Sequence, residues 1–345
     1  MTPIPDSMTM KSELVLDVID THTEGEPTRI LFWNSVPGNL KSAALMKDYF
    51  MKNFDYIRKI MLLEPRGHRD QFGAIVMPPV SQDADYTVLY ITTDGYIDMC
   101  GHATIGLSTA LVSMGTVKAE EPVTKIIYDT VAGKVEARVN VRNGEPLSVS
   151  VIDVESFYLG ERRINVGEPV NAEVKVNLSY GGNFYAIVDG NEIGLDVDAG
   201  NIGDLIAAGM AIRKSTFEQF TPSHPENEKS NTYPLAMITG TPKINHSNYR
   251  SVVIFSDGSF DRSPCGTGTA SRGAFLYSKG LLKEGESFVH ESINNTTFSC
   301  RIVSARKEGD RLVVVPEITG RAWITQISRI FVDPSDPLKH GFLVG

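Results

Sequence analysis

The sequence predicts an α/β (α+β) protein of two similar domains, in each of which strands surround one apolar helix. A chain of 345 residues is long for a single hydrophobic core. Two stretches of the form Asp-Gly-x-x-Asp, starting at Asp94 and Asp257, each lead through a short spacer to a Cys-Gly pair, at Cys100 and Cys265. The two cysteines lie 165 residues apart in related contexts, so we interpret the chain as a duplication of one unit.

The first half of the chain is predicted to consist mainly of strands. A loose extension, 1–13, precedes a strand at 14–19, which ends in a polar run at 20–29. Helical spacing of aromatic and aliphatic residues predicts a helix at 47–61. Runs rich in β-branched residues predict further strands at 73–77, 86–92, 124–129, 134–141 and 147–154.

A short apolar helix is predicted after each cysteine. Small and aliphatic residues follow Cys100, and Gly115 is the expected C-cap of that helix. The stretch 270–278 repeats this pattern after Cys265 and ends at Gly280, again 165 residues after its counterpart. Strands of the second half are predicted at 184–188, 251–255, 288–290, 298–303 and 311–315.

Composition excludes several functional classes. The net charge is -9, the sequence pI is about 5.4 and no Lys/Arg cluster occurs, which argues against a nucleic-acid partner. No apolar run approaches the ~18 residues that would span a membrane. The N-terminal stretch has no signal-like apolar segment and the chain has three cysteines, so we expect a cytoplasmic protein without a disulfide framework.

Cysteine at the start of a helix suits acid/base chemistry. The first N–H groups of a helix lack internal partners and carry partial positive charge, so we expect the thiol pKa to fall from ~8.5 toward neutrality. The same N–H groups bind a carboxylate, and a glycine after the cysteine lets ligand atoms approach the backbone. Two such thiols facing each other across a carbon would supply a proton donor and a proton acceptor.

Other interpretations of the cysteines are weaker. A lone cysteine is usually a buried structural residue, and we assign that role to Cys300, which lies in a strand-like run. Metal binding is not expected, because the zinc-ligand spacings are absent. A Cys-His hydrolase built on Cys100 and His102 is the main rival, but we expect residues two apart in sequence rarely to make such a contact, and Cys265 would be left without a role.

Both cysteine motifs closely resemble those of the proline racemase family. The resemblance covers nearly the whole chain and takes in residues 20–29, 64–73 and 181–186. The family includes proline racemases, 4-hydroxyproline 2-epimerases and 3-hydroxyproline dehydratases. It implies a diaminopimelate-epimerase-like fold of two pseudo-symmetric domains, each a β-barrel-like sheet around a central helix.

On this resemblance, we expect residues 14–160, together with about 322–345, to form the first domain, which contains Cys100. Residues 161–321 would form the second domain, which contains Cys265. The expected partner is a small-molecule substrate, and a homodimer is left open.

The resemblance also implies a mechanism, a cofactor-independent proton transfer in which Cys100 and Cys265 are the two acid/base residues. His102 and Asp261 would flank the ring nitrogen of the substrate. Backbone N–H groups would hold the carboxylate, and these belong to Gly101, His102, Gly266 and Thr267. No cofactor or metal is expected, since the secondary amine of proline cannot form the imine of pyridoxal enzymes in the usual way.

The residue at the second cysteine position separates activities within the family. Dehydratases resemble this chain but carry Thr there, because one base suffices to eliminate water, whereas inversion needs a second group on the far face. Cys265 therefore favours a racemase or epimerase. Phe72 and Phe255 match aromatic positions that enclose the ring in proline racemases, so we predict proline as substrate. Epimerisation of 4-hydroxyproline, alone or together with proline, is the alternative, ahead of a dehydratase or a non-catalytic amino-acid-binding protein.

Overall fold

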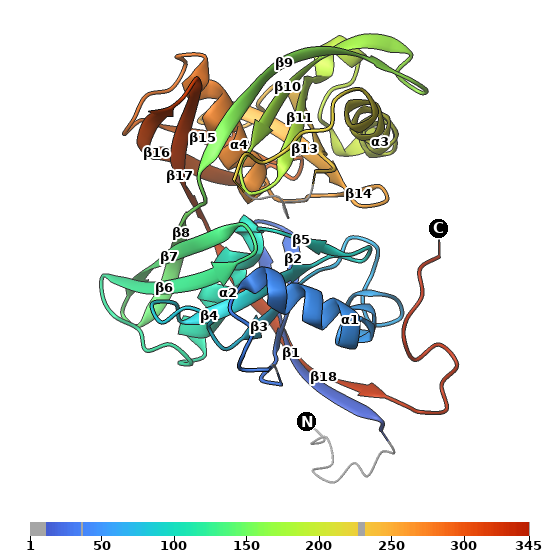
Figure 1. Ribbon diagram of the computed structural model, residues 1–345, viewed down its shortest axis with the longest axis vertical. Coiled ribbons are helices and arrows are strands. Elements are labelled where there is room, and N and C mark those ends of the chain that lie inside the picture. Colours follow the sequence, from blue (N-terminus) through green and yellow to red (C-terminus); the bar gives the residue numbers. More distant parts are fainter. Residues whose placement is uncertain (1–11, 36, 227–231, 345) are drawn as a thin grey trace.

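The computed structural model describes residues 12–35, 37–226 and 232–344, so most of the predicted extension, 1–13, lies outside the described residues. The chain forms two stacked lobes, each a curved sheet enclosing one helix (Figure 1). This mixed α/β architecture confirms the predicted fold class. In the described part of the chain no helix is both long and apolar enough to cross a membrane.

The first lobe contains the N-terminal elements and the last strand. In chain order these are β1 (Leu14–Thr23), β2 (Glu26–Phe32), α1 (Ala43–Leu62), β3 (Phe72–Met77), β4 (Tyr86–Ile91), β5 (Tyr96–Ile97), α2 (Gly101–Ser113), β6 (Val123–Thr130), β7 (Gly133–Arg142), β8 (Glu145–Ile152) and β18 (Ala322–Val332). Strand β18 pairs antiparallel with β1, in a register that runs from Leu14 opposite Val332 to Thr23 opposite Ala322. Helix α2 lies inside the sheet, and its residues 101–112 are all buried.

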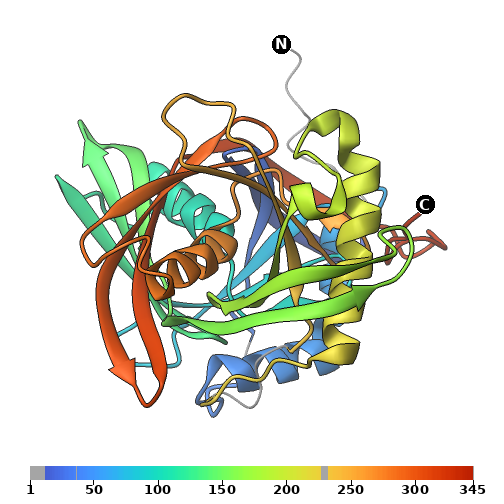
Figure 2. The same cartoon turned by 90° about the horizontal axis from the view of Figure 1, so that it is seen from above.

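The second lobe repeats this plan around α4. Its elements are β9 (Ser156–Val166), β10 (Ala172–Tyr180), β11 (Phe184–Asp189), the 3-10 turns η1 (Gly190–Ile193) and η2 (Ala199–Asn201), α3 (Ile202–Gln219), β12 (Leu235–Gly240), β13 (Tyr249–Phe255), β14 (Ser259–Phe260), α4 (Gly266–Ser278), β15 (Ser287–Glu291), β16 (Thr297–Glu308) and β17 (Arg311–Gly320). Figure 2 shows α4, in orange, surrounded by strands of its lobe. The structural Cys300 is fully buried on β16, where it packs in the core.

The two central helices match each other closely. Each has 13 residues and begins directly after its cysteine. Gly115 and Gly280 follow the C-cap residues with φ of 69° and 70°, the left-handed conformation that a helix C-terminus favours for glycine. The predicted helices and their ends are therefore confirmed.

Several elements differ from the prediction. All the predicted strands are present, but the polar run at 20–29, which we expected to end the first strand, is a hairpin in which β1 and β2 pair across a turn at Glu24 and Gly25. Most of its polar side chains are buried, and because buried polar residues give no apolar strand pattern, the run resembled a loop in the sequence. Helix α3, the strands β9, β10, β12 and β18, and the two-residue strands β5 and β14 were not predicted.

The lobes are joined by two chain crossings. One lies between β8 and β9, and the other lies at Arg321, between β17 and β18 (Figure 1). Strand β17 pairs with both β8 and β9, so the hydrogen bonding continues from one lobe to the other. We propose the division into 14–160 with 322–345 and 161–321. The crossing at Arg321 supports its second boundary, whereas the other crossing, at 153–155, lies a few residues before the boundary at 160/161, which falls inside β9.

Candidate active site

The N-termini of α2 and α4 meet at the centre of the molecule. Cys100 is the N-cap of α2 and Cys265 is the N-cap of α4. A Cβ atom placed on Gly101 would lie 2.7 Å from the Cα of Gly266, and one placed on Gly266 would lie 2.6 Å from the Cα of Gly101. The glycine after each cysteine is therefore needed for backbone contact between the two helices.

His102 and Asp261 lie beside the first thiol. The Sγ of Cys100 is 3.3 Å from Nδ1 of His102, and that nitrogen is 3.9 Å from Oδ2 of Asp261. The expectation that a cysteine and a histidine two residues apart would not be in contact is therefore wrong here. The ring of Phe72 meets that of His102 edge-on, with ring centroids 4.6 Å apart.

The second thiol has a different partner. The hydroxyl of Tyr185, on β11, lies 3.3 Å from Sγ of Cys265 and 2.6 Å from Oγ1 of Thr267. The side-chain amide of Asn183 donates to the carbonyl of Met99 and to Oγ1 of Thr267, at 2.9 and 3.3 Å. Asn183 therefore connects the first turn of α4 to the residue that precedes Cys100, and Tyr185 connects that turn to β11.

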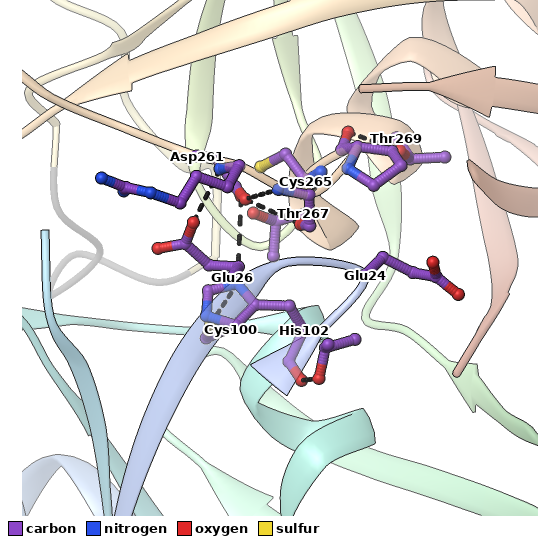
Figure 3. Close-up of polar contacts among 12 residues, drawn as sticks. Glu24, Glu26, Cys100, His102, Asp261, Cys265, Thr267 and Thr269 are labelled. Carbon is purple, nitrogen blue, oxygen red and sulfur yellow. Dashed lines mark hydrogen bonds and ion pairs between the residues drawn. The ribbon is translucent and has the colours of Figure 1, made fainter. Parts of the chain in front are cut away.

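Carboxyl groups from both lobes surround this junction (Figure 3). Asp261 accepts hydrogen bonds from the N–H and the hydroxyl of Ser263, and that hydroxyl accepts one from the N–H of Cys265. Glu26, at the start of β2, accepts a hydrogen bond of 2.6 Å from the N–H of Arg262. Its other oxygen is buried and has no hydrogen-bond partner among the described residues. Glu26 and Asp261 thus fix the loop before α4 against the first lobe.

The pocket between the thiols is small and nearly closed. Its volume is about 20 Å³, room for about one water molecule. Residues from both lobes line it: Phe72, Ile97, Met99, Cys100, Gly101, His102, Asn183, Tyr185, Leu235, Val253, Phe255, Asp261, Cys265, Gly266 and Thr267. An amino acid with a five-membered ring exceeds this volume, so its entry requires the walls to move. The pocket includes all nine predicted site residues.

Comparison with known proteins identifies the family. A sequence model of the family described as Proline racemase matches residues 18–343. The chain belongs to the proline racemase family. It is 40% identical to a proline racemase of Clostridioides difficile over 337 residues, which cover 97% of this chain and 100% of that protein. It is 41% identical to a 4-hydroxyproline 2-epimerase of Streptosporangium roseum over 338 residues, with coverage of 97% and 100%.

A solved structure of another family member has the same fold. It is a hydroxyproline epimerase of Agrobacterium vitis with bound trans-4-hydroxy-L-proline, with a TM-score of 0.89 and 28% sequence identity. The match covers 97% of this chain and 96% of that one. The family and fold inferred from the cysteine motifs are therefore confirmed.

Burial controls the protonation of the two family cysteines. It raises the pKa of both thiols well above the usual value, and Asp261 raises it further. Hydrogen bonding acts in the opposite direction, from the N–H of Ala103 on Cys100 and from the Tyr185 hydroxyl and the N–H of Gly268 on Cys265. The predicted stabilisation by the helix N-terminus is present, but the predicted net lowering is wrong, because the closed pocket removes both sulfurs from water.

Burial also affects the neighbouring acid/base groups. It lowers the pKa of His102, which favours the neutral imidazole, although Asp261 opposes this shift. It raises the pKa of Glu26 well above its usual value, and repulsion from Asp261 adds to the effect, so the protonated acid is favoured. Burial and repulsion from Asp261 therefore disfavour further negative charges on Glu26 and the two thiols.

Sequence reasoning assigned no role to three polar residues at this site: Asn183 and Tyr185, which line the pocket, and Glu26, which holds the loop before α4. Glu26 and Tyr185 reach it from strands far from either cysteine motif. Asn183 and Tyr185 follow the Gly181–Gly182 pair, at the start of β11. Polar residues at the start of a strand that follows two glycines were the signal that could have identified them.

Proposed function

We propose that the protein is a cofactor-independent amino-acid racemase that inverts the α-carbon of proline by transferring a proton between two cysteines. The observation that carries this proposal is the junction of α2 and α4, which brings two cysteine N-caps to one pocket. Inversion needs an acid and a base on opposite faces of one carbon, and two equivalent thiols satisfy this requirement. The relatives named proline racemase and 4-hydroxyproline 2-epimerase are both isomerases that act on amino acids.

The helix N-termini suit the carboxylate of the substrate. Backbone N–H groups of Gly101, His102, Gly266 and Thr267 belong to the first turns of the two helices, where N–H groups lack internal partners. A carboxylate held between them would place the α-carbon between the two sulfurs. The same donors stabilise the negative charge that develops on the carboxylate as the α-proton leaves.

The ring nitrogen is assigned to the side of the pocket that contains His102 and Asp261. The Asp261 carboxylate is 3% exposed, so a positively charged amine would compensate its charge. One thiol must be a thiolate to act as base. The positive substrate nitrogen and the helix N–H groups favour that thiolate against the effect of burial, and closure around the substrate keeps water out.

Phe72 and Phe255 are assigned to the ring of the substrate. Their ring centroids lie 4.9 Å apart, and both line the pocket. An apolar wall would leave the hydroxyl of 4-hydroxyproline without a partner, at a cost of about 1–3 kcal/mol. Proline is therefore the preferred substrate. Epimerisation of 4-hydroxyproline is the second candidate, because a structurally similar family member was solved with that ligand bound.

Circular dichroism of purified protein incubated with L-proline, trans-4-hydroxy-L-proline or trans-3-hydroxy-L-proline tests this function. We expect the optical signal of L-proline to decay to zero, which marks a racemic mixture. A colour assay for a cyclic imine product separates dehydration from inversion. Absence of α-hydrogen exchange in deuterated water with all three substrates, together with absence of the cyclic imine product, would show that the protein is not a racemase, epimerase or dehydratase of these substrates. The cytoplasmic location and the homodimer stay predictions.

A further inference from the structure

A second and larger cavity lies next to the catalytic pocket. Its volume is about 210 Å³, against about 20 Å³ for the catalytic pocket. Four side chains line both spaces, and they form the partition between them: Phe72, Ile97, Leu235 and Phe255. Residues from both lobes contribute to the larger cavity, as they do to the smaller one.

Two side chains of opposite charge line this outer cavity, and the mechanism above uses neither. Asp94 lies between β4 and β5, and Arg213 lies on α3. Arg213 is only 7% exposed. Its Nε donates to the carbonyl of Pro234 at 2.9 Å and its Nη1 donates to the carbonyl of Ser256, while its Nη2 has no hydrogen-bond partner among the residues that the structure describes.

Ser256 holds the two charges at a fixed separation. Its hydroxyl donates to Oδ1 of Asp94 at 2.6 Å, and its carbonyl accepts from Arg213. Its φ is 46°, a left-handed conformation that is strained for a residue with a Cβ and that clusters at functional sites. Thr92 also donates to Oδ1 of Asp94, so within the described ranges Oδ2 of Asp94 is left without a partner.

The charges are close but do not neutralise each other. Burial lowers the pKa of Arg213, and the negative charge of Asp94 opposes that lowering. No ion pair joins Asp94 to Arg213 in the described part of the chain. The walls around them are aromatic: the ring of Tyr233 lies 4.9 Å from the Arg213 guanidinium carbon, and Tyr96 also lines the cavity. The cavity therefore combines one cation, one anion and apolar walls.

We propose that this cavity is an outer binding site for an amino-acid zwitterion, which the substrate occupies on its way to and from the catalytic pocket. Nη2 of Arg213 binds the carboxylate, and Oδ2 of Asp94 accepts a hydrogen bond from the positively charged ring nitrogen. The aromatic walls contact the ring. Phe72 and Phe255 move aside to let the substrate pass. This inference rests on the proposed function, because it takes proline as the substrate.

A ternary complex tests the outer site directly. The planar analogue pyrrole-2-carboxylate is added just above the concentration that fully inhibits racemisation, so that it fills the catalytic pocket. It carries no positive nitrogen and therefore lacks the group that Asp94 binds. Saturation-transfer NMR then measures the binding of L-proline. We expect L-proline still to bind, whereas complete displacement by the analogue would overturn the proposal.

Three variants locate that second proline. Asp94→Asn keeps an oxygen for the hydrogen bonds from Thr92 and Ser256 but removes the charge, so ternary binding should weaken by about tenfold. Arg213→Gln should act in the same direction, with folding checked by circular dichroism because the side chain is buried. Asp310→Asn is the control, since Asp310 is an exposed carboxylate that lines neither the catalytic pocket nor the outer cavity. Unchanged ternary binding in Asp94→Asn would place the second proline elsewhere and refute the site.

Racemisation of L-proline by the same preparations keeps the two proposals separate. A protein that does not racemise proline counts against the proposed function. A protein that racemises proline but forms no ternary complex counts against the outer site alone.

Discussion

The two cysteine units share a backbone plan but differ in what contacts each sulfur. Both place the cysteine directly before a 13-residue helix. Cys100 has an extended backbone, with φ of -144°, and its thiol contacts His102 from the same helix. Cys265 has φ of 64°, and its thiol contacts Tyr185 from a neighbouring strand. The duplication has therefore kept the helix N-terminus and changed the group beside the thiol.

This difference follows the asymmetry of an amino acid. A carboxylate on the axis between two helix N-termini makes equivalent contacts with both lobes. In the proposed binding mode the nitrogen and the ring lie off that axis, so the groups assigned to them need not be equivalent in the two lobes. His102 comes from the first lobe and Asp261 from the second, while Phe72 and Phe255 contribute one ring each. Substitutions in the cysteines and helix N-termini, which both units share, should therefore lower activity more than substitutions in the side chains that differ between the units.

The largest effect is expected when either thiol is removed. Cys100→Ser and Cys265→Ser should each lower racemisation of L-proline by about 10²- to 10⁴-fold, the range for general acid–base groups. Cys300→Ala is the control, because Cys300 is buried on β16 and contributes to neither pocket. Polarimetry measures the rates. Retention of more than a few per cent of inversion by either serine variant would contradict the two-base assignment.

A smaller loss is expected when the contact between the helices is disturbed. Gly266→Ala adds a Cβ that would lie 2.6 Å from the Cα of Gly101. The helices must separate, and a displacement of about 1 Å between acid/base groups can cost on the order of 10²-fold in rate. Gly203→Ala, in the first turn of α3, is the control because no atom lies within 4 Å of the added carbon. Equal kcat/KM in both variants would show that the close contact is unimportant.

Removal of the Tyr185 hydroxyl tests the feature that belongs to the second unit alone. That hydroxyl lowers the pKa of Cys265, so Tyr185→Phe should raise the pKa further. Less thiolate then forms at a given pH, and the acidic limb of kcat/KM should move to higher pH. The rate near neutrality should fall about tenfold, as for the loss of one hydrogen bond. Tyr128→Phe, which removes a buried hydroxyl that is bonded to Ser108 and contacts neither thiol in the described part of the chain, is the control. An unchanged pH profile would be inconsistent with this role.

The smallest effect is expected in the choice of substrate. Phe72→Tyr or Phe255→His adds a polar group to one of the two facing rings. The ratio of kcat/KM for trans-4-hydroxy-L-proline to that for L-proline should rise by up to about tenfold. Rates with both substrates, measured on wild type and both variants, give this ratio. A wild-type enzyme that prefers 4-hydroxyproline would reverse the assigned preference and leave the two-cysteine mechanism intact.

Local patterns explain what the sequence could predict. The helices after the cysteines and their glycine ends at Gly115 and Gly280 depend on residues a few positions apart. Helix α3 was missed because Gly209 lowers its helix propensity. In the structure, a Cβ at Gly209 would lie 2.4 Å from a side-chain carbon of Ile254, so tertiary packing requires the glycine.

Long-range packing explains what the sequence could not predict. Glu26 reaches Arg262 across 236 positions, and Tyr185 reaches Cys265 across 80. No local pattern in the sequence indicates such contacts. The thiol pKa values depend on how far the lobes exclude water, which is a property of the whole pocket. A helix N-terminus could be predicted from sequence, but its burial could not.

The pairing of β1 with β18 determines the order in which the chain can fold. Leu14 lies opposite Val332, so the sheet of the first lobe is completed only by a strand that the ribosome makes after the whole second lobe. Until then β1 pairs only with β2, and its other edge is open to pairing with other chains. All the strands of the second lobe, β9 to β17, are synthesised before β18. During synthesis the C-terminal half of the enzyme should therefore reach its native structure first, and the N-terminal half should be the one that depends on chaperones.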